Sequence, residues 1–481
     1  MSDKLEISPR LSNEDLLPEK QQKWGWYSIF AFWMSDVHSV GGYVFAASLF
    51  ALGLNGIQVF ISLLVGISIV LLFANLMGKP GQKCGAPFPV VARMSFGVFG
   101  ANIPAVIRGL IAVVWYGIQT YLASSAFIIL ILYFFPSAES LANSEFLGLS
   151  YLGWVGFSSM WILQAIIFMF GMDMIRKVID WSGPAIYIAM FALCIYLVNL
   201  AGWDNISFNL SSQELVGWDA IIQMFIAACL VAGYFAGPTL NFSDFSRYCT
   251  SYKQLKLGNI LGLPVNFIIF SLFSVLIVSA SIPVFGEMIT DPVETVKRLD
   301  SGMITILGAL TFIFATVGIN IVANFVAPAF DFSNVAPQKI SFKAGGFIAA
   351  FGSVLLTPWN LFNNPEVIHY TVDVLAAMIG PLYGIIIVDY YFIKKGHIHL
   401  DSLYTESPKG IYWYQNGINM KSVYALIIAG LLAIYATFFI DGLANYAIFI
   451  GGFTAAITYR VLMAKEREKM VDVQANLAEQ S

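Results

Sequence analysis

Long apolar segments recur along the whole chain, and they constrain its fold more than any other feature. Each approaches the ~20 residues that a helix needs to cross ~30 Å of hydrocarbon. Twelve can be recognised, near 27–53, 56–77, 101–134, 151–171, 181–202, 217–241, 258–284, 303–328, 344–361, 366–392, 422–440 and 443–464. Because 58% of the 481 residues are hydrophobic and only 11% are charged, the sequence predicts an all-α polytopic protein of the lipid bilayer.

The distribution of lysine and arginine predicts the orientation. The N-terminal segment and the even-numbered connections are basic, as Lys23, Lys83 and Arg247 illustrate, whereas the connections after spans one, three, five, nine and eleven contain no Lys or Arg. Cytoplasmic loops accumulate these residues. We therefore expect two cytoplasmic tails, residues 1–24 and 466–481, around a transporter domain at 25–465. The first 20 residues and the polar tail after Tyr459 are expected to be mobile.

Other function classes lack support in the sequence. A net charge of -4 gives no reason to expect a nucleic acid partner, and the four cysteines show no paired or metal-binding spacing. No HExxH, GxSxG or nucleotide-binding loop is present in the sequence. We therefore predict neither an enzyme nor a metal site, and no cofactor other than a coupling ion.

Two apolar segments are interrupted at corresponding positions, five spans apart. The first, YSIFAFWMSDVHSVGGYVFAASLFALG, contains Gly41 and Gly42, and the sixth, IAACLVAGYFAGPTLNFSDFSR, contains Gly237 and Pro238. Glycine weakens a helix and proline removes a backbone donor. Paired interruptions of this kind are typical of transporters built from inverted repeats. The alternative is that both are ordinary kinks of membrane helices.

Span three carries a polar stripe. At ~100° per residue, Arg108, Ala112, Trp115 and Gln119 fall on one face. An aromatic ring beside an amide suits a planar, hydrogen-bonding heterocycle. The alternative is a lipid-facing tryptophan with a glutamine bonded to a neighbouring helix. Arg108 lies about two turns closer to the cytoplasm, where it either faces an inner vestibule or extends to the interface.

Spans one and eight carry further polar groups at membrane depth. Asn320 and Asn324 share one face of span eight, where they either bind a ligand or join helices. Asp36 and His38 are candidates for a proton relay or an ion site, because ionisable groups are rare in this environment. Alternatively, Asp36 caps a broken half-helix and His38 bonds a backbone carbonyl.

Four stretches resemble the nucleobase–cation symporter family, which includes cytosine, allantoin, uracil and hydantoin permeases. They are PFPVVARMSFGVFGANIPAVIRGLIAVVWYGIQTYL, GYFAGPTLNFSDFSRY, GINIVANFVAPAFDFSNVAPQKISFKAGG and GPLYGIIIVDYYFIKKGHIHLDSLY. The similarity extends over roughly residues 15–465. It implies a monomeric, bacterial inner-membrane permease of twelve helices. Its leucine-transporter-type inverted repeats of five helices would occupy roughly 25–202 and 215–392, and two extra helices would follow at 422–464.

The resemblance also implies a set of site residues. A nucleobase-like ring would bind between helices one, three, six and eight. Trp115 resembles the stacking aromatic of helix three, and Gln119 resembles the amide beside it. On helix six the second stacking aromatic precedes Asp244 by nine residues, which indicates Phe235, with Tyr234 as the adjacent alternative. The ligand-binding asparagine of helix eight corresponds to Asn324, with Asn320 one turn away, and Ser39 would complete the pocket.

The expected coupling ion differs from that of the sodium-coupled members of this family. Sodium-coupled members of the family bind the ion with carbonyls of helices one and eight and two hydroxyls of helix eight. The corresponding residues are Ser35 and His38, then Ala315, Gly318 and Ile319. Gly318 and Ile319 offer no hydroxyl, and a hard cation requires several oxygen ligands. We therefore expect coupling to a proton, through Asp36 or His38, rather than to sodium.

Together these features predict a secondary transporter that imports a pyrimidine-like nucleobase or a cyclic ureide by ion-coupled alternating access. Uracil or a related hydropyrimidine ranks first from the sequence. The alternatives are an allantoin, hydantoin, cytosine or thiamine-precursor permease of the same family. A more remote alternative is a membrane sensor that binds its ligand without moving it.

Overall fold

The computed structural model describes residues 7–38, 40–211, 213–299, 301–362 and 365–464. Almost all regular structure is helical. The α-helices are α1 Trp26–Val37, α2 Val40–Ser48, α3 Gly56–Cys84, α4 Phe88–Val91, α5 Arg93–Phe96, α6 Asn102–Phe134, α7 Tyr151–Met169, α8 Met172–Ala201, α9 Gly217–Tyr234, α10 Ala236–Leu240, α11 Ser243–Ser246, α12 Tyr252–Ile260, α13 Asn266–Phe285, α14 Pro292–Lys297, α15 Gly302–Ile319, α16 Ala327–Val335, α17 Phe342–Leu355, α18 Pro358–Phe362, α19 Pro365–Ile387, α20 Met420–Phe439 and α21 Ala447–Leu462. Wider π-helical turns join α12 to α13, join α15 to α16 and extend α19, at Leu261–Val265, Asn320–Val326 and Val388–Ile393.

The helices follow the predicted spans in order. Within the described ranges, nine helical stretches are long and apolar enough to cross a membrane. The other three predicted spans correspond to the interrupted pairs α1–α2 and α17–α18 and to the shorter α21. The all-α membrane architecture is therefore confirmed. One boundary was misplaced, because α8 begins at Met172 rather than near residue 181.

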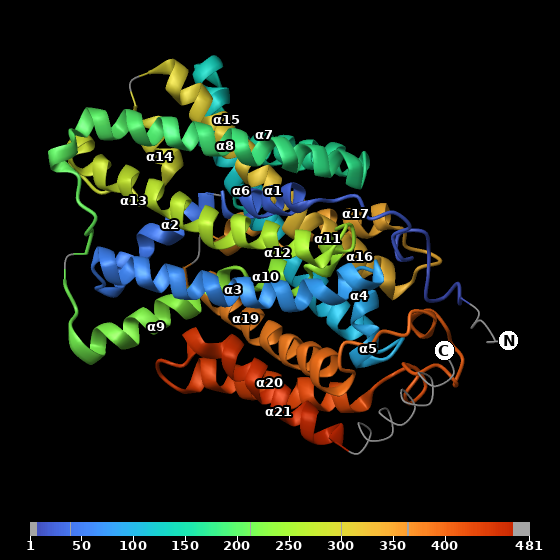
Figure 1. Cartoon of the computed structure of the whole chain (residues 1–481). Helices are drawn as coiled ribbons and strands as arrows, with labels where there is room; N and C mark the ends of the chain where they lie inside the picture. The colour runs from blue at the N-terminus through green and yellow to red at the C-terminus, as the bar shows by residue number, and fades with distance from the viewer. Residues whose placement is uncertain (1–6, 39, 212, 300, 363–364, 465–481) are drawn as a thin grey trace.

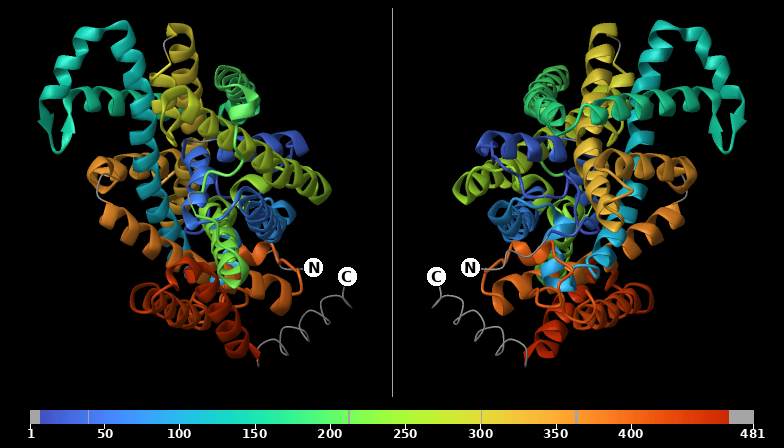
Figure 2. Two further views of the ribbon diagram at one scale, coloured as in Figure 1. Left: turned by 90° about the vertical axis from the view of Figure 1, so that its left-hand side faces the viewer. Right: turned by 90° about the vertical axis from the view of Figure 1, so that its right-hand side faces the viewer.

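Helices α3, α8, α20 and α21 run roughly along one direction, with α8 towards one side and α20 and α21 at the other, whereas α6 and α15 cross them steeply (Figure 1 and Figure 2). Between them, α6 packs along α15 and α16, and α3 packs along α9. A short hairpin of β1 Glu145–Phe146 and β2 Leu149–Ser150 extends to one side (Figure 2). We call the end that carries α4, α5, α11 and the segment before α1 the basic end, because Arg93, Arg176 and Arg247 lie there.

The first interruption does not coincide with the glycine pair. Helix α1 ends at Val37, His38 caps it with a backbone bond to Met34, and α2 starts at Val40. Gly41 and Gly42 therefore lie in the first turn of α2 rather than at the break. The prediction was right that this segment is interrupted, but it placed the interruption about three residues too late.

The second interruption lies one helical turn before the predicted one. Helix α9 ends at Tyr234, Phe235 separates it from α10, and Gly237 and Pro238 are inside α10. The reason is the direction of helical hydrogen bonds. Pro238 has no N–H to donate to the carbonyl four residues earlier, and its ring crowds that carbonyl. Proline therefore interrupts the helix upstream of itself, at residues 234–235.

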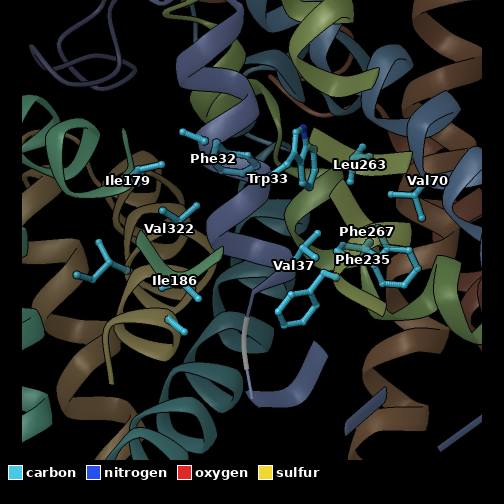
Figure 3. Packing of buried hydrophobic residues seen from close by; sticks show 14 of the residues in the cluster. Phe32, Trp33, Val37, Val70, Ile179, Ile186, Phe235, Leu263, Phe267 and Val322 are labelled. Carbon is cyan, nitrogen blue, oxygen red and sulfur yellow. The ribbon is translucent and has the colours of Figure 1, made fainter. Parts of the chain in front are cut away.

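Close packing holds α1 against the helix formed by α12 and α13. The Trp33 indole donates to the Asn259 side chain at 2.7 Å, and its ring lies over Gly262. Figure 3 shows Phe32 and Trp33 of α1 beside Leu263 and Phe267. A Cβ at Gly262 would approach Trp33 Cβ to 2.6 Å, so only glycine permits this spacing.

The N-terminal segment is not free, contrary to expectation. The Arg93 guanidinium donates to the Leu11 carbonyl at 2.7 Å, and Arg247 donates to the carbonyls of Asp15 and Leu17 at 2.9 and 2.6 Å. The Asp15 carboxylate in turn accepts from the Phe342 amide at 3.0 Å. Residues 8–17 therefore form a strap across the basic end. The tail at 466–481 lies outside the described residues.

Gly262→Ala should destabilise the protein by roughly 1–3 kcal/mol, because the added methyl group overpacks the contact between α1 and the Leu261–Val265 turn. Thermal unfolding in detergent, followed by loss of the monodisperse chromatographic peak, would measure the effect. Gly430→Ala is the matched control, since its Cβ would have only an ordinary contact, 3.8 Å from Met378 Sδ. Equal unfolding temperatures for the two variants would contradict this account of the packing.

Candidate functional site

A cavity of about 320 Å³ lies where the two interrupted helices face α6 and the π-helical turn after α15. This size falls within the range of roughly 300–1,000 Å³ that small-molecule sites occupy. Its walls include Ala444 and Asn445, just before α21, whereas Arg108 lies on the side of the basic end. Backbone that departs from a regular helix is tolerated at membrane depth only where protein or a cavity surrounds it. The two interruptions therefore determine where this cavity can form.

Aromatic side chains from three helices line the cavity. Trp115 comes from α6, Tyr234 from the end of α9 and Phe45 from α2. The Tyr234 and Phe45 rings are 5.1 Å apart. Large aromatic faces of this kind favour a flat ring between or beside them.

Of the two predicted positions on helix six, the structure places Tyr234 and not Phe235 in the cavity wall. Phe235 is fully buried on the other side and packs edge-on against Phe267 with centroids 5.3 Å apart (Figure 3). Asn320 also lies behind the wall, whereas Asn324 reaches the cavity. Ser39 falls outside the described residues.

The cavity wall contains several polar groups that the sequence singled out. Gln119 and Asn324 lie on it, as does Asp36 at the end of α1. The Gln119 Oε1 and Asp36 Oδ2 atoms are buried without a hydrogen-bond partner among the described residues. Asp373 of α19 also lines the cavity, which the sequence reasoning did not anticipate. Buried polar atoms without partners are costly, so these groups are suited to meeting a polar ligand.

Arg108 connects three helices at the floor of the cavity. Its Nε donates to Asn241 Oδ1 at 2.5 Å and to the Gly237 carbonyl at 3.3 Å, and its Nη2 donates to the Ala323 carbonyl at 3.0 Å. The carboxyl groups of Asp331, Asp244 and Asp36 lie close enough to interact with it electrostatically. Fully buried, it does not extend to the interface. The sequence left that alternative open, and the structure excludes it.

The π-helical turn explains why the Ala323 carbonyl is available to Arg108. In the π register, the carbonyl of residue 323 would accept from residue 328, which is Pro328 and has no N–H. On helix six, the Tyr383 hydroxyl donates to the Ala236 carbonyl at 2.7 Å. Side chains of α6 and α19 thus satisfy carbonyls at the irregular parts of helices six and eight.

His38 lies away from the cavity wall. Its Nε2 is 2.8 Å from Asn266 Oδ1, and its ring stacks on Phe270 with centroids 4.6 Å apart. The Asn266 amide nitrogen donates to the Gly262 carbonyl at 3.2 Å, so its oxygen is the atom that faces His38. His38 therefore bonds a side chain of α13, and the Gly183 backbone also interacts with its ring, in line with the backbone contact considered from the sequence.

The residues at the expected ion position are buried together. A Cβ built on Gly318 would lie 3.8 Å from Ser35 Oγ and 3.6 Å from Ser182 Oγ. Both hydroxyls are buried without a partner among the described residues, as is Oγ1 of Thr316, the residue after Ala315. Ser182 of α8 was missed from the sequence, where the only signal was a serine before Gly183-Pro184.

Comparisons with known proteins agree on one family. A model described as a permease for cytosine/purines, uracil, thiamine and allantoin matches residues 16–453. The chain is 32% identical to the allantoin permease of Bacillus subtilis (strain 168), covering 95% of this chain and 94% of that protein. It is also 32% identical to the purine-uracil permease of Arabidopsis thaliana, covering 91% and 73% respectively. In fold it is similar to Mhp1, a nucleobase-cation-symport-1 family transporter solved with bromovinylhydantoin bound (TM-score 0.75, 21% identity, 96% of both chains).

Arg108→Lys should weaken the contacts that separate the cavity from the basic end. A lysine ammonium lacks the fork geometry that reaches Asn241, Gly237 and Ala323 together. Hydrogen bonds to charged groups contribute roughly 1.5–3 kcal/mol each, so losing one favours opening by about tenfold or more. Alkylation of Cys229, which lines the cavity, would report this opening in a protein whose other cysteines are replaced by serine.

A maleimide confined to the side of the basic end should label Cys229 about tenfold faster in the Arg108→Lys variant. Arg460→Lys is the matched control, since Arg460 sits over the Phe392 ring and takes no part in the cavity. An unchanged labelling rate in Arg108→Lys would show that Arg108 does not hold the cavity closed.

Proposed function

Because the chain belongs to the family of permeases for cytosine/purines, uracil, thiamine and allantoin, we propose that it imports a cyclic ureide or a pyrimidine base by ion-coupled alternating access. One observation carries the proposal. Between two interrupted helices, Trp115 and Tyr234 border a cavity whose remaining wall holds Gln119 and Asn324. Flat faces with an adjacent amide edge suit a small ring that alternates N–H and C=O groups.

Allantoin is the first substrate to test, and uracil is the second. Uracil, allantoin, hydantoin and cytosine all share the –NH–CO– unit that an amide can recognise. Relatives that match nearly the whole chain include an allantoin permease, and a purine-uracil permease is equally identical over a shorter part of its own length. Both rings can stack on Trp115 and Tyr234, so the selectivity between them depends on the polar groups of the wall, Gln119 and Asn324.

The orientation of the protein in the membrane is inferred from the positive charge at the basic end. Lys and Arg gather on the cytoplasmic side of membrane proteins. In this assignment both ends of the chain are cytoplasmic. Arg108 and the strap of residues 8–17 close the cytoplasmic side, and the cavity wall at Ala444 and Asn445 lies toward the outside. A substrate would then enter from the outside and leave once these contacts separate.

We assign proton coupling to Asp36, which lines the cavity and lies within the field of Arg108. His38 is a weaker candidate because its ring is bonded to Asn266 away from the cavity. Protonation of Asp36 removes its attraction to Arg108 and supplies a donor to the cavity. A proton can therefore favour one geometry of the pocket over another, as coupling requires.

Sodium coupling is the second candidate, and a specific observation favours it. The hydroxyls of Ser35 and Ser182 converge beside Gly318 without partners among the described residues. They supply oxygen ligands close to the position where Gly318 itself offers none. Hard cations bind through several such oxygens.

Purified protein in proteoliposomes should accumulate labelled allantoin or uracil when an inward proton gradient is imposed. Replacing Trp115 with alanine should reduce uptake by roughly tenfold or more, because a stacking aromatic contributes about 0.5–1.5 kcal/mol beyond the area that it buries. Trp115→Phe should retain most of the activity. Failure of allantoin, uracil, hydantoin and cytosine alike to accumulate, or binding without accumulation, would overturn the proposal.

Asp36→Asn should separate coupling from translocation. Asparagine resembles a permanently protonated aspartate in shape, so exchange of labelled for unlabelled substrate should continue while accumulation against a gradient is lost. Parallel assays with imposed proton and sodium gradients measure both activities. If Asp36→Asn still accumulates substrate under a sodium gradient alone, then the Ser35–Ser182 position, rather than Asp36, carries the coupling ion.

A further inference from the structure

A chain of buried amides runs behind the cavity wall. Asn324 lies on the wall, and its side-chain nitrogen donates to Asn320 Oδ1 at 3.1 Å. The Asn320 nitrogen then donates to Gln164 Oε1 of α7 at 2.7 Å and to Thr120 Oγ1 of α6 at 3.0 Å. Asn320, Gln164 and Thr120 are fully buried and do not line the cavity. We call these three residues the amide relay.

A backbone carbonyl fixes the direction of the relay at its far end. The Gln164 amide nitrogen lies 3.1 Å from the Met160 carbonyl, which can only accept a hydrogen bond. The nitrogen must therefore be on that side of the Gln164 amide, and the oxygen must be on the side of Asn320. Gln164 is thereby an acceptor for its neighbour.

A second backbone carbonyl fixes the next member independently. The Asn320 nitrogen lies 3.1 Å from the Tyr116 carbonyl, so this atom must also be a donor. With its nitrogen committed to Tyr116, Thr120 and Gln164, Asn320 presents only its oxygen to Asn324. Thr120 agrees with this direction, because its hydroxyl donates to the Tyr116 carbonyl at 2.7 Å and can therefore only accept from Asn320.

The orientation of Asn324 follows. Its nitrogen is turned inward to Asn320 Oδ1, which leaves the carbonyl oxygen as the group facing the cavity. That oxygen has no hydrogen-bond partner among the described residues. Nothing in the sequence of Asn324 itself selects this orientation, since an isolated amide can rotate by 180° and exchange its two ends.

We propose that Gln164 and Asn320 are positioning residues that hold the Asn324 carbonyl oxygen toward the cavity, and that the site thereby selects ligands with a ring N–H at this position. The inference rests on the proposed function and extends it to the chemistry of one ring edge. Gln119 Oε1 and Asp36 Oδ2, which have no hydrogen-bond partner in the described part of the chain, add acceptors to the same wall. Arg108 Nη1, likewise without a partner there, supplies a donor for a ring carbonyl.

The experiment measures discrimination between N–H and N-methyl rings. Purified protein is titrated with hydantoin and uracil, each compared with its 1-methyl and 3-methyl derivatives, by displacement of labelled allantoin. In the unmodified protein, methylation at the nitrogen that faces Asn324 should weaken binding by about tenfold or more. The methyl group removes the donor and leaves the buried oxygen unpaired.

Asn320→Leu should reduce this discrimination to within about threefold, because Asn324 then has no acceptor for its nitrogen and can rotate. Affinity for the parent ring should fall, while affinity for the methylated ring should change little. Gln164→Met, which leaves Asn320 held by the Tyr116 carbonyl, should have an intermediate effect and serves if Asn320→Leu does not fold. A merely structural role would lower stability without changing the ratio of the two affinities.

Asn75→Leu is the matched control. It removes a half-buried amide that accepts from Asn259 at 3.0 Å, between α3 and α12 and away from the cavity. Its discrimination ratio should equal that of the unmodified protein. An unchanged ratio in Asn320→Leu, with the parent rings still bound, would overturn the inference alone. Absence of binding by allantoin, hydantoin and uracil would overturn the proposed function, and the inference with it.

Discussion

Every backbone polar group at membrane depth needs a partner inside the protein, and this requirement organises the structure around its cavity. Around the cavity, side chains from other helices take backbone carbonyls of α10 and of the Asn320–Val326 turn. Tyr383 bonds Ala236, while Arg108 bonds both Gly237 and Ala323. The side chains that satisfy this irregular backbone thereby bring α6, α10, the Asn320–Val326 turn and α19 together around the cavity.

Two kinds of buried polar network meet at that space. On the side of the basic end, a charged network centred on Arg108 links helix three to the irregular backbone of helices six and eight. Farther from the basic end, a neutral network of side-chain amides links α6, α7 and the Asn320–Val326 turn. Charged networks respond to protons and ions, whereas a neutral amide network stays fixed. This arrangement suits a transporter, because the contacts that close the cavity must break and re-form while the groups that recognise the ligand keep their orientation.

The sequence predicted the helical architecture, both interruptions and the cavity residues Trp115, Gln119 and Asn324, because apolar length, proline and polar residues at membrane depth are local signals. It could not fix details that depend on neighbours. The choice between Phe235 and Tyr234 turns on the exact residue where helix six is interrupted. Gln164, Ser182 and Asp373 were missed since each is a single polar residue whose meaning appears only when helices pack. The strap was missed because its bonds are made by arginines far away in the sequence.

The two arginines hold the strap of residues 8–17 through its backbone. Arg93 and Arg247 donate hydrogen bonds to the carbonyls of Leu11, Asp15 and Leu17, and every amino acid has such a carbonyl. Replacing strap residues one at a time would therefore leave most of these hydrogen bonds intact. A scan of single substitutions would then show little effect at any one position of the strap. Shortening the segment by a residue would instead move every carbonyl out of register at once. Related chains can accordingly diverge here in sequence while keeping the length of the segment constant.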